Sequence, residues 1–303
     1  MPGPVTSVFE PVLGTRLALR LTAATHQALA RAEDAVLAEC DRLEDLLSAY
    51  RPDSAWNQWR DGRVDTPAAE VSDLLHLAAR WHALSGGAFN PQVGVLRARW
   101  LHAVVESRPP AADELAALAA GITDLPYQVT DDGRLERHGD CSHLDLHAIA
   151  KGWVADRAAA VALAVDGVSD VVVNLGGDLR HAGDGDLTVR IEDPRTPWDN
   201  APPLATVQVG EGGVATGSGA RRPMQVGAMA YSHVLDPRTG QPVAHTSSAT
   251  VLAADAATAD VLATVTGVLQ PDAAVAWIET VDGAAVLLLD HNGRVRASNR
   301  WPA

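Results

Sequence analysis

The stretch VSDVVVNLGGD, residues 168–178, shows most directly how this chain folds. Its first eight residues, 168–175, are rich in β-branched valine and predict a buried strand, which the following glycine pair closes. A helix is expected just before this strand, from Asp145 to about Val165, with Asp145 as its N-cap. The segments before and after this stretch decide whether the protein is α+β or a doubly wound parallel α/β protein.

Hairpin signals outnumber strict strand–helix–strand alternation on both sides of this stretch. One hairpin is expected over 127–138, and another over 284–298. This pattern predicts an α+β protein with mixed, largely antiparallel sheets rather than a doubly wound parallel sheet. Further helices are expected over 25–47, 67–84, 110–120, 257–268 and 271–279, and further strands over 17–22, 186–193, 205–210, 228–236 and 247–255. A loop is expected over 48–59 and an irregular segment over 87–100, and a glycine-rich stretch with two arginines lies at 212–223.

Composition excludes several classes of protein. The 303 residues are 47% hydrophobic and 20% charged, which is typical of a globular chain. A net charge of −14 argues against binding to nucleic acid or to an anionic membrane surface. No apolar run is long enough for a membrane span, and no signal-peptide pattern opens the chain, so we expect a cytoplasmic protein without membrane insertion. We expect one domain over 1–303, because the informative segments are spread along the chain and no linker divides it.

Two oxygen-bearing side chains lie four residues apart in the helix expected over 257–268. Asp260 and Thr264 face the same way at this spacing. A carboxylate and a hydroxyl on one helix face can bind a hard cation such as Mg²⁺. A surface aspartate and a helix-capping threonine are the alternative interpretation.

Lys151 is the only lysine in the chain and lies in DLHAIAKGW, residues 145–153. Free backbone amides at a helix start, together with an ammonium group, favour phosphate oxygens. An ordinary N-cap followed by a surface lysine fits the same pattern. The glycines of NLGGD, residues 174–178, either let the backbone approach a ligand or only form a turn.

A histidine and a tyrosine are further candidates for the site. His233 precedes a Pro–Gly turn in SHVLDPRTGQPV, residues 232–243, where it could move a proton or contact a phosphate. Tyr50 follows the first long helix, with Trp56 and Trp59 nearby, and could stack on a planar ring. A structural role for His233 and core packing for Tyr50 are the alternatives.

The order of these motifs along residues 10–285 resembles the ApbE-type flavin transferases, the FAD:protein FMN transferases. The matching segments are LGT (13–15), SAYRPDS (48–54), GGAFNPQVGVL (86–96), DLHAIAKGW (145–153), VNLGGD (173–178), RIEDP (190–194), SHVLDPRTGQPV (232–243) and ADVLATVTGVL (259–269).

The resemblance implies a single α+β unit with a flavin nucleotide in a cleft between sub-structures. It implies that FAD is the substrate, that Mg²⁺ is the cofactor, and that FMN passes to a threonine hydroxyl of an acceptor flavoprotein while AMP leaves. Two alternatives stay open at this point. One is an FAD pyrophosphatase that makes FMN and AMP, and the other is a non-catalytic flavin-binding protein.

The resemblance also assigns roles to individual positions. It implies that the metal ligands are Asp260, Thr264 and the backbone carbonyl of Ala148. It implies FAD contacts at Leu13, Tyr50, Ala88, Phe89, Asn90, Asp145, Lys151 and His233. His233 and Asp260 are the expected catalytic residues. The chain departs from the family pattern at four places. It has Leu13 where the family usually has Met, Asn90 where it usually has Asp and His147 where it usually has Gly. It also has TGSG, residues 216–219, in place of a TSG-type segment.

Overall fold

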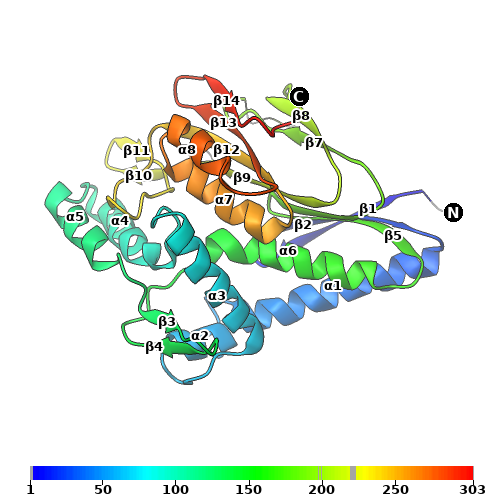
Figure 1. The fold of residues 1–303 in the computed structure, drawn as a ribbon, viewed down its shortest axis with the longest axis horizontal. Coiled ribbons are helices and arrows are strands. Elements are labelled where there is room, and N and C mark those ends of the chain that lie inside the picture. The colour runs from blue at the N-terminus through cyan, green and yellow to red at the C-terminus, as the bar shows by residue number, and fades with distance from the viewer. Residues whose placement is uncertain (1–2, 197, 199, 219–222, 303) are drawn as a thin grey trace.

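One antiparallel sheet runs through the computed structural model and carries helices on one face (Figure 1). The structure describes residues 3–196, 198, 200–218 and 223–302. In these residues the sheet has eight strands in the order β1-β2-β5-β6-β9-β12-β13-β14. Their bounds are β1 Val5–Val12, β2 Thr15–Ala23, β5 Val168–Leu175, β6 Asp178–Gly183, β9 Gly212–Ser218, β12 Thr246–Ala253, β13 Ala285–Asp290 and β14 Val295–Ala297. The predicted α+β class with antiparallel pairing is confirmed.

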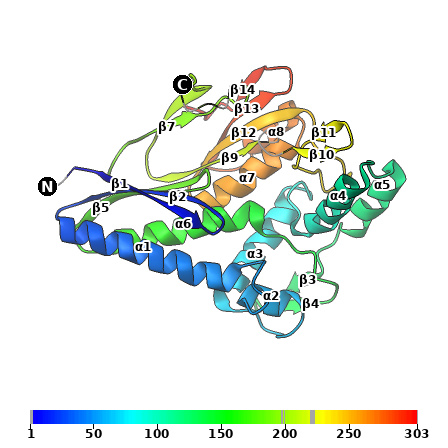
Figure 2. The ribbon, with the colours of Figure 1, turned by 180° about the vertical axis from the view of Figure 1, so that it is seen from behind.

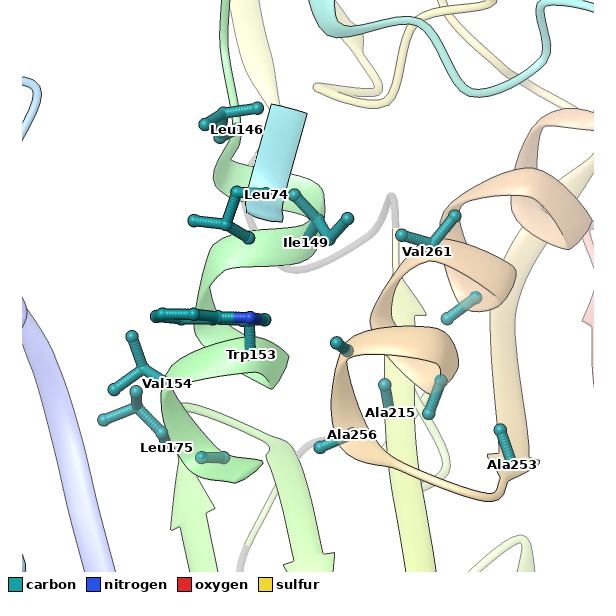
Figure 3. Packing of buried hydrophobic residues seen from close by; sticks show 14 of the residues in the cluster. Leu74, Leu146, Ile149, Trp153, Val154, Leu175, Ala215, Ala253, Ala256 and Val261 are labelled. Carbon is teal, nitrogen blue, oxygen red and sulfur yellow. The ribbon is translucent and has the colours of Figure 1, made fainter. Parts of the chain in front are cut away.

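Three helices pack side by side on one face of this sheet, with α6 between α1 and α7 (Figures 1 and 2). They span α1 His26–Leu47, α6 His147–Leu163 and α7 Ala256–Val268. Their facing sides are apolar and join the sheet in one large core, part of which Figure 3 shows between α6 and α7. The opposite sheet face packs against the small β7–β8 sheet, Leu187–Ile191 and Ala205–Val209.

Most of the remaining elements gather beyond one end of α1 and α6 (Figure 1). They are α2 Ala55–Arg60, α3 Ala69–Leu84, the 3₁₀ turn η1 Pro91–Val93, α4 Gly94–Glu106, α5 Ala112–Gly121, β3 Tyr127–Val129, β4 Leu135–Arg137, β10 Met224–Val226 and β11 Met229–Tyr231. The helix α8, Pro271–Ile278, lies elsewhere and packs on α7. No helix in the described ranges has the length and apolarity needed to cross a bilayer.

Two segments expected to be irregular contain helices, so those expectations were wrong. The loop expected over 48–59 includes the start of α2, whose N-cap Ser54 accepts a hydrogen bond from the N–H of Asn57 at 3.1 Å. The segment 87–100 includes η1 and most of α4. Pro91 lies in the first turn of η1, where a proline is well tolerated because its missing N–H would have no partner within the helix.

Strand expectations also needed correction. The strand expected over 228–236 is only β11, so His233 lies beyond it. The glycine-rich segment 212–223, for which no element was predicted, begins as β9. A Cβ at Gly213 would lie 2.3 Å from the backbone of Asp255, so the glycine allows β9 to approach the start of α7. The residues 219–222 of that segment lie outside the described residues.

Candidate active site

A cleft of about 480 Å³ opens where the end of α1 meets α2, α4 and the start of α6. Four predicted FAD-binding residues line it, and they come from separate segments: Leu13, Tyr50, Asp145 and Lys151. Tyr50 is 85% exposed, so core packing, the alternative for this residue, was wrong. Trp56, by contrast, is buried while still bordering the cleft. An exposed ring at the cleft is free to stack on a planar ligand.

The single lysine lies where the cleft meets the core. Lys151 Nζ donates a short hydrogen bond to the carboxylate of Asp178 and lies 3.4 Å from Oδ2 of Asp260. The backbone N–H of Gly152 donates to the same Asp260 oxygen, also at 3.4 Å. Both carboxylates are buried. The structure therefore joins α6, the start of β6 and α7 in one cluster of charges, Lys151–Asp178–Asp260.

Burial and proximity shift all three groups of this cluster. Burial raises the pKa of Asp178, and the neighbouring Asp260 raises it further against the opposing effect of Lys151. Burial likewise raises the pKa of Asp260, again opposed by Lys151. Burial lowers the pKa of the Lys151 ammonium, but the two carboxylates outweigh it and the net shift is upward. With both acids ionised, the cluster holds one more negative than positive charge, a buried imbalance that a bound cation would relieve.

The residues near Asp260 fit a magnesium ion. Thr264 lies one turn further along α7, half-buried, and its hydroxyl makes no hydrogen bond within the described part of the chain. Ala148 has non-helical φ and ψ of −88° and 15°, which interrupt the first turn of α6 and its regular carbonyl bonding. Among described residues, no three His, Cys, Asp or Glu side chains are placed to hold a metal. Mg²⁺ commonly takes one or two carboxylates and completes its shell with water and phosphate oxygens, so this sparse set suits it.

Asp145 lies in the cleft but does not act as the predicted N-cap. Leu146 occupies the N-cap position, and Asp145 precedes it. The Asp145 carboxylate accepts hydrogen bonds from the His147 N–H at 2.8 Å, from His147 Nδ1, and from Arg97 Nη1 at 3.2 Å. Burial raises the pKa of Asp145, but His147 and Arg97 outweigh it and hold the pKa below its usual value. Asp145 is therefore an ionised, oriented acceptor beside the cleft.

Three predicted FAD contacts lie behind the cleft lining rather than in it. Ala88, Phe89 and Asn90 are buried. Asn90 Nδ2 donates to the carbonyl of Ile122 at 2.8 Å, and its Oδ1 accepts from the N–H of Gln92 at 2.8 Å. The N–H of Asp145 donates to the carbonyl of Pro91 at 2.7 Å. The segment 88–91 therefore supports the turn at Asp145 through this backbone hydrogen bond. Direct FAD contact by Ala88, Phe89 and Asn90 stays a prediction.

His233 was predicted for the site and lies outside the cleft lining, whereas Asp178 was not predicted and belongs to the charged cluster. His233 is exposed in the segment after β11 and is not one of the residues that line the cleft. Its catalytic role stays a prediction. Asp178 was not singled out, because NLGGD also fits a simple turn. The available signal was a carboxylate placed directly after a buried strand and its closing glycines.

Comparison with known proteins assigns this architecture to a family. The chain matches the ApbE family over residues 13–288. The chain belongs to the ApbE family. It is 32% identical to an FAD:protein FMN transferase of Vibrio cholerae over 241 residues, 75% of this chain and 71% of that protein. It is 30% identical to an FAD:protein FMN transferase of Treponema pallidum, over 95% of this chain and 85% of that protein.

A solved ApbE structure has the same fold. The crystal structure of the ApbE protein from Thermotoga maritima superimposes with a TM-score of 0.84 and 25% sequence identity, covering 98% of this chain and 97% of that one. The α+β arrangement and the relative placement of the elements around the cleft are therefore those of the ApbE fold.

Proposed function

We propose that this protein is an FAD:protein FMN transferase that joins FMN to a threonine hydroxyl of an acceptor flavoprotein and releases AMP. Membership of the ApbE family and the transferase names of its relatives support this activity. The observation that carries the proposal is the cluster Lys151–Asp178–Asp260 beside the cleft, where one cation and two buried acids meet. The threonine acceptor, the AMP product and the magnesium ion are the finer parts of the proposal.

The cleft supplies the binding determinants for FAD. Tyr50 offers an exposed ring for the flavin, and the cations Arg60, Arg97 and Lys151 line the same cleft. Such cations offset the charge of two phosphates that an otherwise acidic protein must bind. Asp178 and Asp260 hold the Lys151 ammonium through two of its N–H groups, which leaves the third for a phosphate oxygen.

Asp260, Thr264 and the carbonyl of Ala148 are the proposed magnesium ligands. When bound there, the ion would stabilise negative charge on the pyrophosphate oxygens. In the transfer, the threonine oxygen forms a bond to the FMN phosphorus as the bond to the bridging oxygen breaks. That oxygen leaves with AMP and takes the electron pair, and the hydroxyl proton passes to a base. We assign the base role to His233, whose imidazole suits proton transfer near neutral pH.

The whole chain, residues 1–303, is proposed to act as one flavin-transferase domain. Its cleft and cluster draw residues from Leu13 to Asp260, far apart in sequence. The expected cytoplasmic location and the expected lack of a nucleic-acid partner stay predictions from composition.

The test measures AMP release and protein-bound flavin. Purified protein is incubated with FAD, with and without Mg²⁺, and with and without extract of the source organism. Mg²⁺-dependent AMP that appears together with a fluorescent acceptor band supports transfer. AMP without an acceptor indicates the pyrophosphatase alternative, and tight flavin binding without AMP indicates a flavin-binding protein.

The variant D260A tests the metal assignment in the same assay. We expect it to lose roughly 100-fold or more of the Mg²⁺-dependent AMP release, because a preorganised electrostatic group is removed. Folding should persist, because Lys151 keeps Asp178 as a partner. The matched control is D272A, which removes an exposed aspartate on α8. Equal activity in D260A and D272A would contradict the assignment.

A further inference from the structure

A carboxylate on α6 binds the first turn of α7. Asp156 Oδ1 accepts from the N–H of Ala256 at 2.8 Å, and its Oδ2 accepts from the N–H of Ala257 at 2.9 Å. The first N–H groups of a helix lack partners within the helix, and its own N-cap satisfies only some of them. Here the N-cap Asp255 accepts from Thr258 at 2.7 Å, so Asp156 supplies the bonds that Asp255 leaves open.

A glycine one turn earlier on α6 lets the two helices touch. A Cβ at Gly152 would lie 2.2 Å from the carbonyl oxygen of Ala256 and 2.8 Å from Cα of Ala257. Any side chain there would push the α7 backbone away. Figure 3 shows α6 and the start of α7 facing each other at this level. We call Gly152 and Asp156, with the two α7 residues that they contact, the α6–α7 clasp.

The clasp lies beside the charged cluster on both helices. Lys151 directly precedes Gly152, and Asp260 lies one turn beyond Ala256. The N–H of Gly152 donates to Asp260 Oδ2 at 3.4 Å, so a residue of the clasp bonds directly to a residue of the cluster. A shift of α7 along or away from α6 would therefore move Asp260 relative to Lys151.

Arg180 of β6 holds the chain that enters α7. Its Nη1 donates to the carbonyl of Ala254 at 2.7 Å, and its Nε lies 3.7 Å from Asp156 Oδ1. The approach to α7 is thus tied both to the sheet and to α6.

We propose that Asp156 is a positioning residue of this site, which holds α7 against α6 so that the Asp260 carboxylate stays beside Lys151. Within the described residues, the Asp156 side chain makes its hydrogen bonds and ion pair with Ala256, Ala257 and Arg180 and none with the cleft lining or the cluster, so it acts through α7. Its effect on turnover rests on the proposed function, whereas its effect on Lys151 does not. The competing explanation is a helix cap that only stabilises the fold.

The single lysine supplies a direct readout. With lysine labelled by ¹³C and ¹⁵N, the protein gives one side-chain amine signal, that of Lys151. In D156N, the amide keeps one acceptor oxygen and turns an N–H₂ donor toward the other α7 amide. We expect the Lys151 signal to shift toward that of a free lysine, and FMN transfer to fall by ~10- to 100-fold.

Two further variants separate positioning from stability. T25A removes the N-cap hydrogen bond of α1, a bond of the same kind at the end of α1 away from the cleft. We expect T25A to lower the melting temperature and to leave the Lys151 signal unchanged. D156E keeps two acceptor oxygens on a longer chain and should shift the signal less than D156N. It provides the same comparison with wild type if D156N does not fold.

The proposal is overturned if the folded Asp156 variants keep the wild-type Lys151 signal, or if T25A shifts it as much as they do. Failure of the proposed function looks different. In that case the wild-type protein releases no AMP and transfers no FMN, while the Lys151 signal still responds to the Asp156 variants.

Discussion

Lys151 and Asp178 form an ion pair in which the only lysine of the chain donates to a buried carboxylate 27 residues further along. Asp178 opens β6, whereas Lys151 lies in the second turn of α6, so the pair ties the central sheet to the helix layer. The same ammonium group lies 3.4 Å from Asp260 of α7. One cation therefore neutralises part of the charge on two acids that come from different layers.

Removal of this cation should weaken both FAD binding and folding. In K151A, Asp178 and Asp260 face each other without a positive partner. The Lys151 side chain is 35% exposed, so solvent screens the pair and the cost stays below the value of about 3–5 kcal/mol for a fully buried pair. We expect weaker FAD binding by titration calorimetry and a lower melting temperature than wild type. The matched control is R134A, which breaks an exposed pair with Asp132. Wild-type FAD affinity in K151A would contradict the phosphate role of Lys151.

The stability loss in K151A should depend on pH in a defined direction. Burial, together with Asp260, raises the pKa of Asp178 above the unfolded value. A raised carboxyl pKa contributes stability that is present at low pH and lost as pH rises through the folded-state pKa. The difference in melting temperature between wild type and K151A should therefore widen as pH rises above the ordinary carboxylate range. A constant difference across that range would show that the two acids do not drive the effect.

The pH profile of activity should show the ionisation of Asp156. Burial raises its pKa to about 6, and the nearby Asp255 adds to this, against the Ala256 and Ala257 N–H groups and Arg180. Below this pH the protonated carboxyl loses charge and one acceptor position, so we expect transfer to decline as pH falls through about 6. D156N should be slower and should lack this decline. The measurement is turnover against pH, with T25A as control.

The raised pKa of Asp156 makes folding stability depend on pH in the opposite direction to activity. Because the pKa of Asp156 is raised in the folded state, its contribution to stability is complete below the unfolded value and is lost as pH rises through about 6. As pH rises through about 6, ionisation of Asp156 should therefore lower the stability of the fold and raise the rate of transfer. A profile in which both fall together at acid pH would assign the decline to unfolding instead.

Asn90 should not tolerate replacement by aspartate. Its Nδ2 donates to the carbonyl of Ile122, and in N90D a carboxylate oxygen would face that carbonyl. Loss of a buried hydrogen bond of this kind costs about 1–3 kcal/mol. We expect a lower melting temperature for N90D, measured beside N292D, which makes the same change in an exposed turn. An N90D protein as stable as N292D would show that this position is free to change.

Both cysteines should be unreactive in the folded protein. Burial raises the pKa of Cys40 to about 11, with nearby acids adding to the effect. Burial also raises the pKa of Cys141 to about 11. Because the thiolate is the reactive form, a thiol reagent at pH 7–8 should label neither residue until the protein is unfolded in denaturant. Rapid labelling of the native protein would contradict the burial of these thiols.

The sequence by itself determined the α+β class, most helices and the order of the motifs. Periodicity, caps and turn residues act over a few positions, so the helix expected over 25–47 matches α1 within one residue at its start. The same local rules misjudged α2, which is only six residues long, and α4, which follows Pro91 of η1, because proline is common both in loops and at helix starts.

Only the tertiary structure decided which motifs share a site. Lys151 meets Asp260 across 109 residues because Gly152 lets α7 approach α6 and Asp156 binds its first turn. It also showed that Asn90 lies in the core and Tyr50 in water. Burial and proximity depend on how distant segments pack, and no short stretch of sequence carries that information.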